Sequence, residues 1–227
     1  MKKSSTMVLV LATLLCFGAF AMGSGSSSGS SVSSNKGSDD SNEEIVETTL
    51  ETTTTEATTT VDYTAGMDLS TANAFGSAVS YLDFMGFSRD GLIDQLTSEY
   101  GDGYTQEQAE TAIEALEEYG LVDWNEQAVR SAQSYLDYSG FSRAGLIDQL
   151  SSEYGGQFTE EEATYAVDYL EENGLVDWNE QAVRCAESYL EFSTFSRQEM
   201  IDQLSSEYGE QFTEEQAIYA CDQIGLT

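Results

Sequence analysis

The chain repeats itself from about Ser70 to its end, and this repeat limits the fold more than any other feature. The tripeptide Ser-Tyr-Leu begins at Ser80, Ser134 and Ser188, so each copy follows the previous one after 54 residues. Phe-Ser-Arg recurs with the same step, and no residue is inserted between copies. A constant period over three copies is typical of tandem repeat proteins. We therefore expect three copies of one small structural unit.

Each repeat carries the sequence signals of three short helices. In the second repeat, apolar residues recur at helical spacing, and polar caps and glycines divide them into three groups. In chain order, the predicted starts and stops are Asp123, Gly140, Ser142, Gly155, Thr159 and Gly174. The apolar face of the second helix is expected to comprise Leu146, Ile147, Leu150 and Tyr154. The predicted fold is all-α, with three tandem three-helix repeats of helix-turn-helix character.

Two segments precede the repeats. Lys2 and Lys3, followed by an apolar run that ends at Phe20, form the pattern of an export signal, and the run is too short for a membrane span. The segment 22–69 is rich in Gly, Ser, Thr and Glu and has few apolar residues, which predicts a disordered tether. The predicted division is an export signal at 1–21, the tether at 22–69, and repeats at 70–123, 124–177 and 178–227.

The export signal leaves two processing routes open. Ala19-Phe20-Ala21 fits a signal peptidase site, and cleavage after Ala21 would release a secreted protein. Alternatively, Cys16 is the lipid-modified residue of a lipoprotein, although Leu15 is larger than the small residue that normally precedes such a cysteine. We expect an exported chain that is either lipid-anchored at Cys16 or freely secreted.

The charge of the chain excludes several classes of partner. The formal net charge is −33, and only eight residues are basic. Nucleic acids and anionic membranes would repel such a chain, because affinity for phosphate groups comes mainly from Lys and Arg. A basic protein is the partner that this charge favours, and membrane contact is expected only through a lipid anchor.

The sequence offers little for catalysis. The chain has no His and the repeats have no Lys, which excludes His-based triads, ordinary zinc sites and phosphate-binding loops that need Lys. The EF-hand pattern is missing, and acidic clusters lie at predicted helix starts, where they complement the helix dipole. We expect a protein that is not an enzyme and that uses no metal or cofactor.

Four residues of the repeats are candidates for a structural role. Trp124 and Trp178 lie where one repeat passes into the next, and we expect each to pack into the seam with the preceding repeat. The alternative is that each Trp covers the core of its own repeat. Cys185 and Cys221 lie on the first and third helices of the last repeat. They predict a disulfide in an exported protein, with two buried free thiols as the alternative.

Two further groups are candidates for contact with a ligand. Arg89, Arg143 and Arg197 each lie at the start of a helix, which is an unfavourable end for a cation. Each should therefore pair with a carboxylate on a neighbouring helix, or bind a partner. Tyr138 and Tyr165 fall outside the apolar stripes and are candidate exposed contacts.

The repeated strings resemble a known family. The strings that carry the resemblance are Asp-Trp-Asn-Glu-Gln-Ala, which begins at Asp123 and Asp177, and Ser-Tyr-Leu, Phe-Ser-Arg and Leu-Ile-Asp-Gln-Leu. Through these strings, the repeats resemble the Ltp-type host cell surface-exposed lipoproteins. The resemblance covers residues 70–227. It implies small helical domains tethered to the outer face of Gram-positive-type cells. It also implies, for some phage-encoded members, superinfection exclusion by blocking DNA injection, with a phage tail tape-measure protein as the target.

The leading hypothesis is a tethered cell-surface protein that binds a basic partner, for which a phage tape-measure protein is the implied candidate. The alternative is a structural or adhesive surface protein that binds cell wall material or a host ligand.

Overall fold

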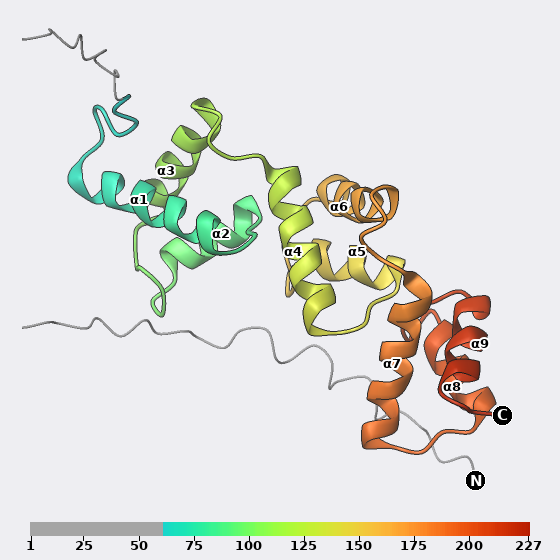
Figure 1. The fold of residues 1–227 in the computed structure, drawn as a ribbon. Helices are drawn as coiled ribbons and strands as arrows, with labels where there is room; N and C mark the ends of the chain where they lie inside the picture. Colours follow the sequence, from blue (N-terminus) through green and yellow to red (C-terminus); the bar gives the residue numbers. More distant parts are fainter. Residues whose placement is uncertain (1–60) are drawn as a thin grey trace, which may run out of the picture. The chain divides into compact units, whose positions relative to one another are not determined.

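The computed structural model describes residues 61–227, which form nine helices and no strand (Figure 1). The helices are α1 (Leu69–Phe84), α2 (Arg89–Thr97), α3 (Gln106–Glu118), α4 (Trp124–Tyr138), α5 (Arg143–Ser151), α6 (Glu160–Glu172), α7 (Trp178–Phe192), α8 (Arg197–Ser205) and α9 (Glu214–Gln223). The prediction of an all-α fold with three tandem three-helix repeats is confirmed. The predicted export signal, Cys16 and the tether up to residue 60 lie outside the described residues.

The local sequence explains where the helices begin. An Asp caps the first helix of each repeat, a Ser caps the second and a Thr caps the third. The Thr caps form capping boxes, in which the cap side chain and the side chain three residues later each accept the other's backbone N–H. The same three caps in the same order therefore set the same three helices in every repeat.

Each repeat encloses its own small core. In the first repeat, Ala74 of α1 and Ala112 of α3 are fully buried, and such small side chains let the two helices lie close together. Leu92 and Leu96 of α2 are also fully buried in this core. The second and third repeats repeat the arrangement with cores of their own. A three-helix repeat of this size buries little apolar surface, so contacts between repeats should add to stability.

The structure differs from the sequence prediction just after α5 and just before α1. The placement of Tyr154 on the apolar face of the second helix is wrong, since its side chain is 85% exposed. The physical reason is that α5 ends at Ser151, so Tyr154 lies in a turn to which helical spacing does not apply. Near the start of the described residues, Tyr63 and Met67 were assigned to the tether but pack against the first core.

The first two repeats meet at a glycine. Gly86 follows α1 and lies against α4 of the second repeat. A Cβ atom at Gly86 would lie 2.4 Å from the carbonyl oxygen of Gln127 and 2.7 Å from the backbone nitrogen of Ser131. Both are backbone atoms of a helix and cannot swing aside. The close approach of α4 to this point therefore requires a residue without a side chain.

The second and third repeats meet in the same way. Gly140 follows α4, and a Cβ atom there would lie 2.8 Å from both the carbonyl oxygen of Gln181 and Sγ of Cys185 in α7. In the third repeat the same register holds Thr194, which is exposed. Glycine thus stands at the two positions of this register where the next repeat approaches.

We predict that Gly86→Ala lowers the free energy of unfolding by about 1–3 kcal/mol, because the added methyl group meets the backbone of α4. Gly76→Ala is the matched control, because nothing lies within 4 Å of a Cβ atom at this position of α1. In a helix interior that exchange should stabilise by about 0.5–1 kcal/mol. Urea denaturation measures both variants. Equal effects of the two substitutions would contradict the steric role of Gly86.

Candidate functional site: repeat junctions and the acidic surface

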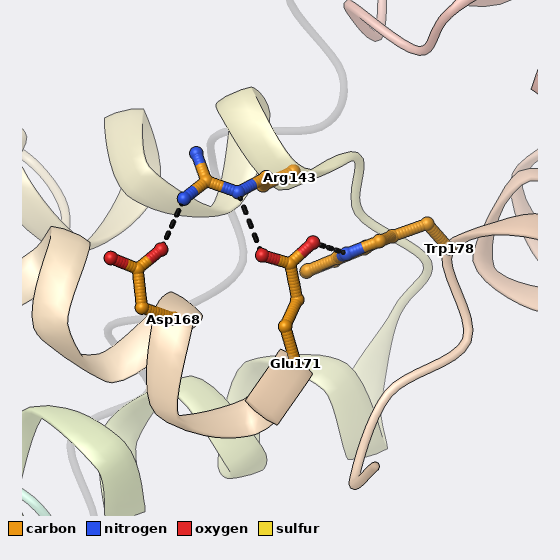
Figure 2. A network of polar contacts seen from close by, with 4 residues as sticks. All are labelled: Arg143, Asp168, Glu171 and Trp178. Carbon is orange, nitrogen blue, oxygen red and sulfur yellow. Dashed lines mark hydrogen bonds and ion pairs between the residues drawn. The ribbon is translucent and has the colours of Figure 1, made fainter. Parts of the chain in front are cut away.

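A tryptophan at the start of each later repeat contacts the core of the repeat before it. Trp124 is the first residue of α4 and packs against the first core, and Trp178 is the first residue of α7 and packs against the second. Figure 2 shows the indole of Trp178 directed at Glu171 of α6, with 2.6 Å between Nε1 and Oε1. Trp124 donates the same bond to Glu117 of α3 over 3.0 Å. Each bond joins the last helix of one repeat to the first helix of the next.

The same two glutamates also pair with the recurring arginines. Nε of Arg143 lies 3.1 Å from Glu171, and its guanidinium also pairs with Asp168 (Figure 2). Arg89 and Glu117 form the equivalent pair in the first repeat, also over 3.1 Å. Each glutamate therefore accepts hydrogen bonds from an arginine of its own repeat and from the tryptophan of the next.

In the third repeat, the corresponding arginine keeps the aspartate partner but not the glutamate, because Gly225 lies in the register of Glu171. Arg197 pairs with Asp222 of α9 over 2.6 Å and donates to the carbonyl oxygen of Leu226 over 2.5 Å. The structure thus places Arg89, Arg143 and Arg197 in pairs with the third helix of their own repeat.

Two other arginines cap helices across the junctions. Arg130 of α4 donates to the carbonyl oxygens of Leu82 and Asp83 at the end of α1, the latter over 3.1 Å. Arg184 of α7 makes the same contacts with Leu136 and Asp137 at the end of α4. The last carbonyl groups of a helix have no partner within it and carry partial negative charge. A guanidinium is therefore a favourable cap there, and this one comes from the next repeat.

A strained glutamine completes each junction. Gln157 and Gln211 have φ angles of 55° and 60°, in the left-handed region that residues other than glycine rarely adopt. Their side-chain amides donate to Asp94 over 3.0 Å and to Asp148 over 2.9 Å, in each case on the preceding repeat. The contact to the neighbouring repeat gives a physical reason for glutamine at a position where glycine would be less strained.

The first repeat lacks the side chains that make these contacts. In the registers of the tryptophan, the capping arginine and the glutamine it has Ser70, Gly76 and Gly103. The junction residues Arg130, Arg184, Gln157 and Gln211 were missed by the sequence analysis. The signal that could have found them was this difference between the first copy and the later two.

The predicted disulfide between Cys185 and Cys221 is not formed in the structure, where both are buried free cysteines. Cys185 faces Gly140 across the junction, whereas Sγ of Cys221 lies 3.9 Å from the carbonyl oxygen of Arg197 in its own repeat. The two thiols thus serve different contacts. Burial is the main cause that raises the pKa of each thiol, so both stay protonated at neutral pH.

The two tyrosines proposed as exposed contacts lie on α4 and α6. Tyr138 ends α4 with 68% of its side chain exposed. Tyr165 is 47% exposed and stacks on Tyr169 of α6, with 6.3 Å between ring centroids. Their surroundings therefore differ, since Tyr165 has an aromatic neighbour on its own helix.

The positive and negative charges have different surroundings. All five arginines of residues 61–227 bond to carboxylates or carbonyl oxygens within the chain, as described above. Most carboxylates lie on the surface instead. The described surface is therefore strongly acidic, with its few cations already paired.

The described residues contain no grouping of metal-ligating side chains. No helix of this part is long and apolar enough to cross a membrane. The arrangement in residues 61–227 is that of a polar surface on small helical units.

We predict that Arg184→Met lowers the free energy of unfolding by about 1.5–3 kcal/mol, because it removes charged hydrogen bonds to partly buried carbonyl groups. Arg143→Met is the matched control, since its ion pairs are exposed and such pairs contribute about 0–1 kcal/mol. Denaturation curves compare the two variants. A larger loss for Arg143→Met than for Arg184→Met would contradict the capping role.

The chain was compared with known proteins. The family described as host cell surface-exposed lipoprotein, Lipoprotein_Ltp, matches residues 70–116, 123–170 and 177–224. Among solved structures, Ltp, a superinfection exclusion protein from the Streptococcus thermophilus temperate phage TP-J34, is 33% identical, with 44% of this chain and 95% of that chain covered and a TM-score of 0.39. No curated protein matches the chain. The three matches together show that the chain belongs to the Ltp family of host cell surface-exposed lipoproteins, which places it outside the cell, at the surface.

Proposed function

We propose that this protein is a non-enzymatic, tethered surface protein whose repeats bind a basic protein. One observation carries the proposal: every arginine of the described region is engaged within the chain, while most of the carboxylates are exposed to solvent. With a net charge of −33, the chain attracts cations over a long range and repels nucleic acid and anionic lipid. A partner rich in Lys or Arg fits this charge.

The proposed biological role is exclusion of an incoming phage. The similar Streptococcus thermophilus phage protein is described as a superinfection exclusion protein, which supports this role. The proposed target is a basic region of the phage tail tape-measure protein. Binding of the tape-measure protein at the cell surface would block entry of the phage DNA, without affecting the earlier adsorption of the phage.

Exclusion at the surface requires that the protein stays there, and the proposed anchor is a lipid on Cys16. Membership in a lipoprotein family supports this route over cleavage after Ala21. We predict that the mature protein has a mass corresponding to a lipid-modified chain beginning at Cys16. Cys16→Ser should move the protein from the cell fraction to the medium. A mature chain beginning at Met22 would contradict the anchor and support secretion.

We predict that cells expressing the protein adsorb phage normally but take up less phage DNA. Adsorption is measured by depletion of free phage, and uptake by the amount of phage DNA inside the cells. Cells expressing Cys16→Ser are the matched control, because they make the same repeats without the proposed anchor. Normal DNA uptake for every phage tried would contradict the exclusion role.

The adhesive alternative predicts a different partner. If the proposed function is correct, the purified protein should bind a basic protein at low salt and release it at high salt, because screening weakens contacts between exposed charges. Binding to purified cell walls that survives high salt would instead favour a structural or adhesive role.

A further inference from the structure

The turn after the second helix has the same four residues in every repeat. Ser-Glu-Tyr-Gly occupies 98–101, 152–155 and 206–209. The tyrosines of these turns are the most exposed large hydrophobic side chains of their repeats, apart from Phe192 in the third. Tyr100, Tyr154 and Tyr208 are 94%, 85% and 78% exposed.

The fold explains the first and last residues of this motif. The Ser hydroxyl accepts the backbone N–H of the Tyr, as at Ser98 and Tyr100 over 3.2 Å, and the other two turns repeat this bond. The Gly is needed because a Cβ atom at Gly101 would lie 2.2 Å from the carbonyl oxygen of Gln95. The other two turns have contacts of 2.0 Å at the same place. Ser and Gly are therefore requirements of the turn.

The fold does not explain the Glu and the Tyr between them. Within residues 61–227, the side chains of these Glu-Tyr pairs make no hydrogen bond, ion pair or ring contact. These two exposed positions nevertheless hold the same acidic and the same aromatic residue in all three repeats.

We propose that the three Glu-Tyr pairs, 99–100, 153–154 and 207–208, bind Lys and Arg side chains of the basic partner. This inference rests on the proposed function and names the contact residues. The electron-rich face of a Tyr ring attracts a cation, and an adjacent carboxylate adds a charged hydrogen-bond acceptor. Adjacent Cα atoms are about 3.8 Å apart, so one long basic side chain can contact both groups. Three equivalent pairs on one chain strengthen binding to a partner with several basic residues.

The exposed aromatics that end α1 and α4 are a less suitable site for a cation. Phe84 and Tyr138 end α1 and α4, where Arg130 and Arg184 already bind the carbonyl groups. A basic side chain would meet a fixed guanidinium there. Within the described residues, none of the arginine ion pairs involves a glutamate of the Glu-Tyr pairs.

The test uses the full mature protein and two probes, an oligolysine and an oligoarginine peptide, with an oligoglutamate peptide as the negative control. Calorimetry at low salt measures the dissociation constants. The charge variant combines Glu99→Gln, Glu153→Gln and Glu207→Gln. Its matched control combines Glu114→Gln, Glu161→Gln and Glu215→Gln, which are exposed glutamates on the third helices. Both variants lose three negative charges.

We expect the charge variant to weaken binding by about tenfold or more, and its matched control to weaken it clearly less. Equal weakening would overturn the assignment, because net charge alone would then explain binding. If the unchanged protein binds neither basic probe, the proposed function fails. If it binds and only the comparison of variants fails, the site assignment alone is wrong.

A second variant tests whether binding needs the aromatic rings of the tyrosines or only their apolar surface. Tyr100→Leu, Tyr154→Leu and Tyr208→Leu together keep exposed apolar side chains in the turns and remove the aromatic rings. We expect a similar loss of affinity for both probes, with far-ultraviolet circular dichroism unchanged because these side chains are largely exposed. Unchanged affinity would overturn the role of the tyrosines.

Discussion

The arrangement of the repeats depends on the contact between a glycine and the backbone of the next repeat's first helix. At Gly86 and Gly140 the helix approaches so closely that no side chain fits. This close approach brings the capping arginine to the helix end, and it accompanies the tryptophan and glutamine contacts of the same junction. Small three-helix units with separate cores are thereby joined through backbone contacts and a few polar bonds.

The junctions also decide where the charges lie. The described region has few cations, and all of them are bonded within a repeat or between repeats. The carboxylates are left on the surface, together with tyrosines that the turns do not need. The same distribution that stabilises the fold therefore produces an acidic surface with aromatic groups. We propose that this surface binds a basic partner outside the cell.

The repeat period and the caps made the fold predictable, because each helix start depends on residues adjacent in sequence. The junctions were harder to predict. The tryptophans marked their position, but the partners of Arg130 and Gln157 are distant in sequence and belong to another repeat. Tyr154 was misplaced because the helix ends three residues earlier. Helix positions alone could not show whether Cys185 pairs with Cys221. In the structure, Cys185 lies against Gly140 of the preceding repeat.

The most direct test of coupling between repeats is the reactivity of Cys185. Its thiol lies at the second junction, and burial raises its pKa, so little reactive thiolate forms near pH 8. Alkylation mapped by mass spectrometry should be slow at Cys185 in the native protein and faster in Gly140→Ala. Cys221, inside the third core, should stay slow in both. Alkylation of Cys185 as fast in the native protein as in the unfolded chain would contradict a closed junction.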